Sequence, residues 1–309
     1  MKRAKKSLKK ERKIHYKIFF CSLFIFIAAF FTVIFISGLF GGNGSEKNPL
    51  NDVQNQRINL LITGLDQDGL RTDLILIASY NTSSKKTDIL LIPENTRMYV
   101  GGRYQKISAA HAIYKNGKPK GISGTIEALN RLTAIPLNYY MEFSEDAFRQ
   151  IIDAFGGVDF NVPRNMKYSD PLQDLYINLK KGRQNLDGDK SCQLLKFASY
   201  EGGVQERTLT QKNFFEELAR QKLNPEYISM LPGLYSELDI KTNLNTEDII
   251  KYSNIILGLC GDDINFCTLP GYQEQNSVTY WIPDMDALKN IIKNTFGYDP
   301  VNITTDKTR

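Results

Sequence analysis

The sequence has very few of the residues that usually build zinc sites and redox centres. It holds two histidines, four cysteines and one tryptophan among 309 residues, and no Cys-x-x-Cys pair. No cluster therefore has the ligand spacing of a structural zinc site. The chain also lacks the signatures G-x-x-x-x-G-K-[ST], G-x-S-x-G and H-E-x-x-H, and no G-x-G-x-x-G follows a predicted strand. These absences argue against P-loop enzymes, α/β-hydrolases, zinc proteases and dinucleotide-binding proteins.

Negative charge is almost missing from the N-terminus. The first 17 residues contain nine Lys or Arg and a single acidic residue, Glu11. The whole chain carries a net charge of +5, but the remainder holds 30 basic and 33 acidic residues and is slightly acidic. The positive charge is therefore local, and it does not indicate nucleic-acid binding by the folded part. We predict no nucleic-acid partner.

Residues 18–40 contain no charged side chain at all. A helix of these 23 residues would be ~35 Å long, enough to cross a hydrocarbon core of ~30 Å. A secretory signal has a shorter apolar segment and a small-residue cleavage site, and neither fits here. We therefore predict a single transmembrane helix at 18–40. Its basic flank keeps the tail 1–17 in the cytoplasm, so the chain after Phe40 is expected outside the cell.

The remaining chain predicts an α/β fold. Residues 41–56 form a Gly/Asn-rich linker, 57–300 a folded domain and 301–309 a tail. Short apolar runs bounded by turn residues predict strands at 58–63, 74–80, 88–92, 139–143, 158–162, 264–269 and 278–282. Helical patterns occupy 123–133, 145–155, 189–198, 209–223, 246–259 and 285–296. Such a mixture predicts a mixed central sheet with helices on both faces.

Two smaller features concern cysteine and histidine. Cys260 and Cys267 flank the segment GDDINF, a spacing that allows a disulfide outside the cell, and the sequence leaves this pairing open. His111 has no evident acidic partner in the sequence. We therefore predict that it is a packed or surface residue and not a general base.

The stretch 64–81 places Asp66, Arg71 and Asp73 between two apolar runs. One interpretation is a solvated turn, because Asp68-Gly69 is a common turn pair. The other is a site for a polyanion and a metal ion at the edge of the sheet. The bulk properties of the chain do not separate the two interpretations.

Later motifs favour the second interpretation. After Gly64-Leu65-Asp66 and Arg71-Thr72-Asp73, the chain continues with LIPENT (91–96), KISAA (106–110), FGGVDFNVP (155–163), KGRQNLDG (181–188), LKFA (195–198) and RTLTQ (207–211). In this order they resemble motifs of the LytR-CpsA-Psr family, namely I-P-R-D-T, K-I-N-A-A, A-L-G-G-V-D-V-N-V-P, K-G-x-Q-x-L-D-G, R-F-R and R-x-x-R-Q. The resemblance runs from about residue 57 to residue 297, and an N-terminal membrane anchor is also typical of the family.

This resemblance implies a membrane-anchored, cell-envelope transferase with a mixed α/β domain. Family members bind polyprenyl-pyrophosphate-linked glycans and transfer the glycan phosphate to peptidoglycan, with Mg²⁺ or Mn²⁺. Planar arginines suit pyrophosphate oxygens, and carboxylates suit Mg²⁺. Carried over by position, the resemblance implies three catalytic residues, Asp73, Arg71 and Arg207. It further implies pyrophosphate binding by Arg71, Lys106, Lys196, Arg207 and Gln211, and metal binding by Asp66 and Asp73.

The chain departs from the family where arginines are expected. Glu94, Ala198 and Thr210 replace arginines, Asn95 replaces an aspartate, and Lys196 keeps only the charge of another arginine. Losing two charge-assisted contacts would cost roughly 10²- to 10⁴-fold in rate. Arg97 and Arg103 are nearby cations that would have to compensate.

Three hypotheses therefore stay open. The chain is an active glycan-phosphate transferase, a non-catalytic polyprenyl-phosphate binder or regulator of cell-wall assembly, or an interaction domain that kept the fold without the site. The sequence names neither the glycan nor its acceptor, and it leaves the oligomeric state open.

Overall fold

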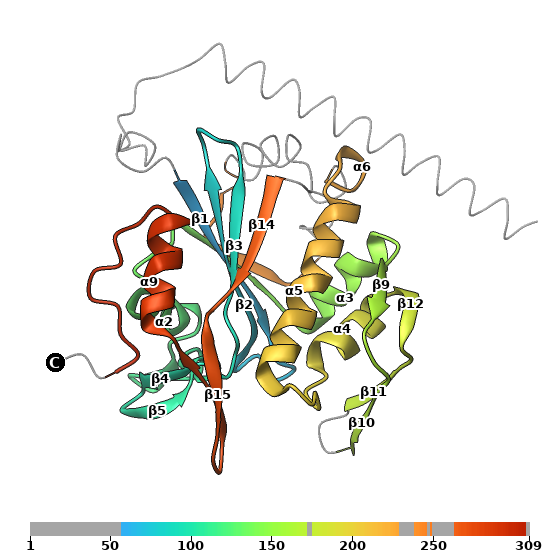
Figure 1. The fold of residues 1–309 in the computed structure, drawn as a ribbon, viewed down its shortest axis with the longest axis horizontal. Helices are drawn as coiled ribbons and strands as arrows, with labels where there is room; N and C mark the ends of the chain where they lie inside the picture. Colours follow the sequence, from blue (N-terminus) through green and yellow to red (C-terminus); the bar gives the residue numbers. More distant parts are fainter. Residues whose placement is uncertain (1–56, 172–174, 229–237, 246–247, 249–262, 307–309) are drawn as a thin grey trace, which may run out of the picture. The chain divides into compact units, whose positions relative to one another are not determined.

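The computed structural model describes residues 57–171, 175–228, 238–245, 248 and 263–306 (Figure 1). All of them belong to the C-terminal unit, Asn55–Arg309. The expected tail 1–17, membrane span 18–40 and linker 41–56 lie outside the described residues, as does the expected helix 246–259 apart from residue 248. Within the described part, no helix has the length and apolar character needed to cross a membrane.

A six-stranded sheet forms the centre of the domain, in the order β13-β8-β1-β2-β3-β14. The sheet is mixed, because β8 and β14 pair parallel to β1 and β3 whereas the β1–β2, β2–β3 and β13–β8 pairs are antiparallel. Its strands are β1 (Arg57–Leu65), β2 (Thr72–Asn81), β3 (Thr87–Leu91), β8 (Tyr139–Phe143), β13 (Ile240–Thr242) and β14 (Ile264–Thr268). The predicted hairpin between β2 and β3 is confirmed.

Helices cover both faces of this sheet, as predicted (Figure 1). Alternate residues of β2 point to opposite sides, so Ile75 and Ile77 enter one buried cluster and Leu76 enters the other. The first cluster includes residues of α2 (Ile122–Thr133) and α9 (Met285–Asn294). The second includes residues of α3 (Glu145–Ala154), α4 (Gly188–Lys196) and α5 (Gly203–Lys222).

Several small two-stranded sheets surround this core, and the sequence predicted few of their strands. In β10 three of the five residues are exposed, so its sequence carries no clear apolar alternation. These pairs are β4 (Arg97–Val100) with β5 (Arg103–Lys106), β6 (Tyr114–Lys115) with β7 (Lys118–Pro119), β9 (Val158–Val162) with β12 (Gly182–Leu186), β10 (Met166–Asp170) with β11 (Leu175–Leu179), and β15 (Gly271–Gln275) with β16 (Thr279–Pro283). Two short helices complete the elements, η2 (Ile107–Ala110) and α6 (Pro225–Ile228).

The first residue of α3 is set by a local cap, whereas the start of α5 depends on a contact with a residue far away in the sequence. The side chain of Ser144 accepts a hydrogen bond from the Ala147 N–H at 3.1 Å, which begins α3 where the sequence predicted. By contrast, α5 begins at Gly203, six residues before the predicted start at 209. There the Val204 N–H donates to Gln273 Oε1 at 2.7 Å. Because Gln273 lies on β15, this cap is invisible in the local sequence.

One edge of the sheet gathers the segments that carry the predicted site. Strands β1, β3 and β8 run in the same direction, and β2 runs in the opposite direction. The residues that follow β1, β3 and β8 therefore meet the start of β2 at a single edge. This topology brings the loop 66–71, Glu94, Glu145 and Asp73 to the same end of the sheet.

Candidate functional site

The loop 66–71 is organised by the first predicted carboxylate. Asp66 Oδ1 accepts hydrogen bonds from the backbone N–H groups of Leu70 (2.8 Å) and Arg71 (3.0 Å). Gly69 has a φ of +68°, which residues with a Cβ atom rarely adopt. Its N–H donates a hydrogen bond to the Asp66 carbonyl at 3.0 Å. The turn interpretation of this stretch is thus correct for Asp66. Its second oxygen, Oδ2, makes no hydrogen bond with the described residues.

A buried hydrogen-bonded pair, His111 and Glu142, contacts this loop. His111 Nε2 lies 2.9 Å from Glu142 Oε2, and His111 Nδ1 lies 3.3 Å from the Leu70 carbonyl oxygen. Lys241 Nζ approaches the other oxygen of Glu142 at 3.2 Å. Burial disfavours the charged carboxylate, but the hydrogen bonds with His111 and Lys241 outweigh it and hold the pKa of Glu142 below its ordinary value. The packed position of His111 is confirmed, while its acidic partner was missed because His111 follows η2 and Glu142 lies on β8, 31 positions away in the chain.

A hollow of about 880 Å³, called here the large groove, opens beside this loop. Five of the predicted site residues line it, and Glu94 lies among them. The five are Asp66, Arg71, Asp73, Lys196 and Arg207. The site predicted from the stretch 64–81 is therefore brought together with cations from α4 and α5.

Glu94 forms an ion pair with Arg207 inside the large groove. Arg207 Nη1 donates to Glu94 Oε1 at 2.7 Å, and Arg207 Nη2 donates to the Leu195 carbonyl at 3.3 Å. Both side chains are largely buried, with exposed fractions of 14% for Arg207 and 19% for Glu94. Gln211 donates to the same carbonyl at 3.0 Å and does not line the groove. A carboxylate thus neutralises the arginine that the sequence assigned to phosphate.

Asp73 is the most perturbed carboxyl group of the groove. Burial raises its pKa, the negative charges of Glu94 and Asp66 raise it further, and Arg207 and Lys196 only partly oppose them. The resulting pKa is about 7, against an ordinary value of 3.8. Near neutral pH this side chain therefore exists in both protonation states, which suits a group that accepts a proton during catalysis.

Lys196 is also paired, with a carboxylate that sequence reasoning missed. Its ammonium group forms an ion pair with Glu145, and the same carboxylate pairs with Arg149 one helical turn further along α3. Two sequence signals were available. Glu145 directly follows the cap of a helix at the end of a strand, and it stands four residues before an arginine.

Lys106 and Arg97 are not brought to this groove. Lys106 lies on β5 and lines neither of the hollows described here. The guanidinium of Arg97 lies 4.3 Å from the centre of the Tyr104 ring, a cation–π contact on the β4–β5 hairpin. The structure therefore does not bring Arg97 to the site as a replacement for the arginine missing at Glu94.

The donors present suit a magnesium ion. Among the described residues no group of three or more His, Cys, Asp or Glu side chains has metal-binding geometry. Mg²⁺ commonly needs only one or two carboxylates, because substrate phosphates and water complete its shell. Asp66 offers Oδ2, and the mutual repulsion of Asp66, Asp73 and Glu94 is the kind that a cation relieves. Asp66 and Asp73 would hold such an ion.

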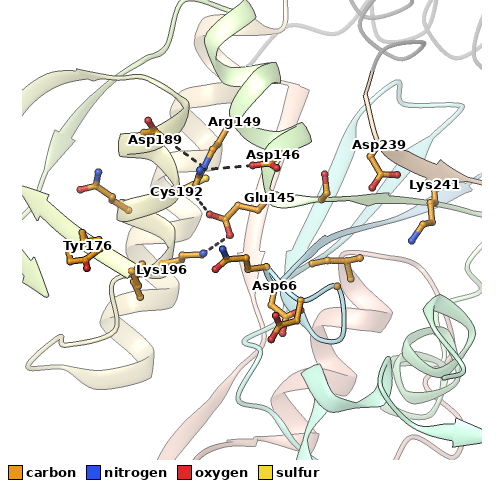
Figure 2. Close-up of a pocket in the computed structure, with 17 residues that line it drawn as sticks. Asp66, Glu145, Asp146, Arg149, Tyr176, Asp189, Cys192, Lys196, Asp239 and Lys241 are labelled. Atoms are coloured by element: carbon orange, nitrogen blue, oxygen red, sulfur yellow. Dashed lines mark hydrogen bonds and ion pairs between the residues drawn. The ribbon is translucent and has the colours of Figure 1, made fainter. Parts of the chain in front are cut away.

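A second hollow of about 510 Å³, called here the small hollow, adjoins the groove. Both share the side chains of 66–68, Leu175 and Lys196 as a common wall. Figure 2 shows Tyr176 at one end of the small hollow and Asp239 with Lys241 at the other. Arg149 projects between Glu145, Asp146 and Asp189.

Neither described cysteine has the character of a nucleophile. Cys192 lines the small hollow but is 6% exposed, and burial raises the pKa of its thiol to about 11 despite a hydrogen bond with Arg149. Cys267 is a free thiol whose Sγ donates to the Ile89 carbonyl at 3.4 Å. The disulfide that the sequence left open is thus not formed at Cys267, and Cys260 lies outside the described residues.

The chain matches the model of the LytR_cpsA_psr family over residues 42–297. It is 24% identical over 253 residues to an uncharacterized protein of Staphylococcus aureus, covering 79% of this chain and 60% of that protein. It is also 24% identical over 270 residues to a polyisoprenyl-teichoic acid–peptidoglycan teichoic acid transferase, TagV of Bacillus subtilis, covering 82% of this chain and 67% of TagV.

A crystal structure of B. subtilis TagV matches the fold with a TM-score of 0.63 at 20% identity, covering 79% of this chain and 99% of that chain. The present chain spans 60% of the length of the S. aureus relative. The family match covers most of the chain and includes the large groove and the small hollow. The chain belongs to the LytR-CpsA-Psr family.

Proposed function

We propose that this chain is a membrane-anchored protein that binds a polyprenyl-pyrophosphate-linked glycan in the large groove and transfers the glycan phosphate to peptidoglycan outside the cell. The observation that carries this proposal is the convergence of Arg71, Lys196 and Arg207 with Asp66 and Asp73 in one groove. The described lining of the groove holds these three cations and four carboxylates, because Asp68 and Glu94 also line it. Cations beside carboxylates suit a pyrophosphate that is bound together with a divalent ion, since the ion offsets the excess negative charge. The anchor is the predicted helix 18–40, which lies outside the described residues.

The transfer can be written with the residues of this groove. An acceptor hydroxyl attacks the phosphorus that carries the glycan, and a new P–O bond forms. The bond between that phosphorus and the bridging oxygen breaks, so that polyprenyl phosphate leaves. Asp73, whose pKa is about 7, accepts the hydroxyl proton. Arg71, Lys196 and Arg207 hold the phosphate oxygens and stabilise the negative charge that develops on them.

Mg²⁺ or Mn²⁺, when bound by Asp66 and Asp73, would supply additional positive charge to the pyrophosphate. The guanidinium of Arg207 is held by Glu94 and the Leu195 carbonyl, so a bound pyrophosphate would compete with Glu94 for this arginine.

A second candidate is a binder of polyprenyl phosphates that does not catalyse transfer. The observation that favours it is the pairing of two predicted phosphate-binding cations with carboxylates, Arg207 with Glu94 and Lys196 with Glu145. A pyrophosphate entering the groove would meet these carboxylates as well as the cations. Such a site would bind its ligand more weakly than a site with free arginines.

The test uses the full chain purified in a mild detergent. Farnesyl pyrophosphate with Mg²⁺, at about 100 times its dissociation constant, is expected to raise the melting temperature by roughly 5–10 °C. Arg207→Ala should lose most of this shift. Arg220→Ala is the matched control, because Arg220 lies on the same helix, is exposed and, among the described residues, pairs with Glu217 alone. No shift in the wild type at millimolar ligand would refute both candidates.

A transfer assay then separates the two candidates. The wild type is incubated with a polyprenyl-pyrophosphoryl oligosaccharide and peptidoglycan, and the covalently attached glycan is counted. Product that disappears in Asp73→Ala supports the transferase. Ligand binding without product at any Mg²⁺ or Mn²⁺ concentration supports the non-catalytic binder.

A further inference from the structure

We propose that the small hollow binds an uncharged, hydroxyl-rich sugar ring that stacks against Tyr176. This inference rests on the proposed function, because the hollow shares a wall with the groove assigned to pyrophosphate. Tyr176 and most residues that line the small hollow lie outside the family motifs, so both the binding site and the stacking residue go beyond that function.

The charges of the small hollow argue against a second phosphate. Its lining holds six carboxylates and three cations. All three cations are already engaged, Arg149 and Lys196 by Glu145, and Lys241 by Glu142. An anion in this hollow would therefore face twice as many carboxylates as cations, and among the described lining residues no cation is unpaired, whereas the groove keeps Arg71 unpaired. A neutral ligand avoids this repulsion.

The orientation of the β10–β11 hairpin places one tyrosine at each hollow. Tyr168 pairs across the hairpin with Ile177, and Tyr176 pairs with Ser169. Because side chains alternate along a strand, Tyr168 and Tyr176 project from opposite faces of the hairpin. Tyr168 lines the large groove, whereas Tyr176 lines the small hollow (Figure 2). The hairpin thus offers an aromatic side chain to each hollow.

The exposed ring of Tyr176 suits the C–H face of a sugar. Its residue is 58% exposed, a large value for an aromatic side chain that lines a hollow. A pyranose ring has an apolar face of C–H groups, which covers an aromatic ring and removes both surfaces from water. The hydroxyl groups at its rim then need hydrogen-bond partners.

The walls of the small hollow provide those partners. The side chains of Asp68 and Asp239 make no ion pair with the described residues, and that of Asp189 is 74% exposed. Carboxylates accept hydrogen bonds from hydroxyl donors strongly. Gln193 Oε1 accepts from the Asn178 N–H at 2.9 Å, which fixes the amide and directs its NH₂ group as a donor. Acceptors and a donor around an aromatic face match a polyol and not an apolar ligand.

The shared wall relates this sugar to the transfer. Lys196 and the segment 66–68 border both hollows, so a ring on Tyr176 lies next to the bound pyrophosphate. The same chemistry has two sources, the acceptor glycan or the first sugars of the donor. The experiment below distinguishes them.

The test measures sugar binding by the full chain in detergent with two probes. The first is chitotriose, a free neutral oligosaccharide, followed by isothermal titration calorimetry and saturation-transfer NMR. The second is a polyprenyl-pyrophosphoryl disaccharide, compared with farnesyl pyrophosphate. Tyr176→Ala is expected to weaken sugar-dependent binding about tenfold, and Tyr176→Phe should stay within twofold of the wild type. Tyr272→Ala is the control, since Tyr272 is 60% exposed on β15 and does not line the hollow.

The outcomes separate this inference from the proposed function. Loss of chitotriose binding in Tyr176→Ala supports an acceptor sugar, and loss only of the sugar-dependent part of donor binding supports a donor sugar. Unchanged binding of both probes in Tyr176→Ala, or no sugar-dependent binding by the wild type, would overturn the inference. Farnesyl pyrophosphate should bind Tyr176→Ala normally, so its binding reports on the large groove alone.

Discussion

The large groove and the small hollow share a wall but differ in how their cations are used. In the groove, Arg71 is exposed and makes no ion pair with the described residues, and Arg207 pairs with a single carboxylate, Glu94. In the hollow, Arg149 is surrounded by three carboxylates, and Lys241 is held by Glu142. The groove thus keeps one unpaired cation, Arg71, for a ligand, whereas every cation of the hollow's described lining is paired. Two neighbouring sites at one sheet edge thus suit different ligands, an anion in the groove and an uncharged ligand in the hollow.

The two sites also differ in how buried their carboxyl groups are. Asp73 is partly buried beside the negative charges of Glu94 and Asp66, with a pKa of about 7. The carboxylates of the hollow include exposed side chains, such as Asp146 at 83% and Asp189 at 74%. Burial and crowding are therefore concentrated where the proposed chemistry needs a proton acceptor.

The largest expected effect comes from removing the charge of Asp73. The folded pKa lies above the ordinary value of 3.8, so the folded state binds more protons between these values. Stability should therefore fall as pH rises from about 4 to about 7, by roughly 4 kcal/mol as an upper bound. Asp73→Asn should be more stable than the wild type at pH 8 by up to this amount and equal to it near pH 4. Urea unfolding at both pH values measures the difference.

The matched control is Asp146→Asn in the small hollow. This carboxylate is exposed, so its loss should change stability by less than about 0.5 kcal/mol at either pH. Equal stability of Asp73→Asn and the wild type at pH 8 would contradict the contrast between the two hollows.

A somewhat smaller effect is expected from His111→Ala. The substitution leaves Glu142 buried with only Lys241 as a partner, and it removes the contact with the Leu70 carbonyl. Breaking a buried pair should cost about 3 kcal/mol in the free energy of unfolding. Because the loop 66–71 borders both sites, pyrophosphate and sugar binding should weaken together. Denaturant unfolding and titration with both ligands measure these losses.

His111→Gln provides the informative comparison, because its amide retains a hydrogen bond to one of the two partners. It should recover part of the stability and part of both affinities. If His111→Ala weakened one ligand and spared the other, the shared wall would not be the common support of the two sites.

The smallest effect is expected from Glu94→Gln. The variant frees Arg207 for the ligand and removes a negative charge beside the pyrophosphate. Farnesyl pyrophosphate should bind about tenfold more tightly, which corresponds to ~1.4 kcal/mol, while sugar binding stays unchanged. Calorimetric titration measures both. Glu127→Gln is the control, because Glu127 lies on α2, is exposed and forms an ion pair with Lys120. Weaker pyrophosphate binding in Glu94→Gln would mean that Glu94 orients Arg207 and does not compete for it.

Much of the fold was accessible from the sequence because its strands are short runs of mainly apolar or alternating residues bounded by turn residues. The strands 139–143 and 158–162 were predicted with their observed bounds. The Ser144 cap was also read correctly, since capping depends on residues three positions apart. The hairpin β10–β11 and the first six residues of α5 were missed. Strand β10 is mostly exposed, and the start of α5 depends on Gln273 of a distant strand.

The candidate site was accessible only in part. The predicted residues Asp66, Arg71, Asp73, Lys196 and Arg207 line one groove, but Lys106 does not line it. The assignment came from motif order, and motif order carries no information about which carboxylate faces which cation. The pairs Glu94–Arg207, Glu145–Lys196 and Glu142–His111 join residues that lie 113, 51 and 31 positions apart.

The sequence alone determined the apolar segment 18–40, the alternation of strands and helices, and the residue types at the edge of the sheet. These follow from local composition and periodicity, which each short segment carries by itself. Only the tertiary structure decided that Arg207 is held by a carboxylate, that Asp73 has a pKa of about 7, and that Tyr176 lies over a neighbouring acidic hollow. Electrostatic interactions depend on distance and burial, and both are set when strands and helices far apart in the chain pack against one another.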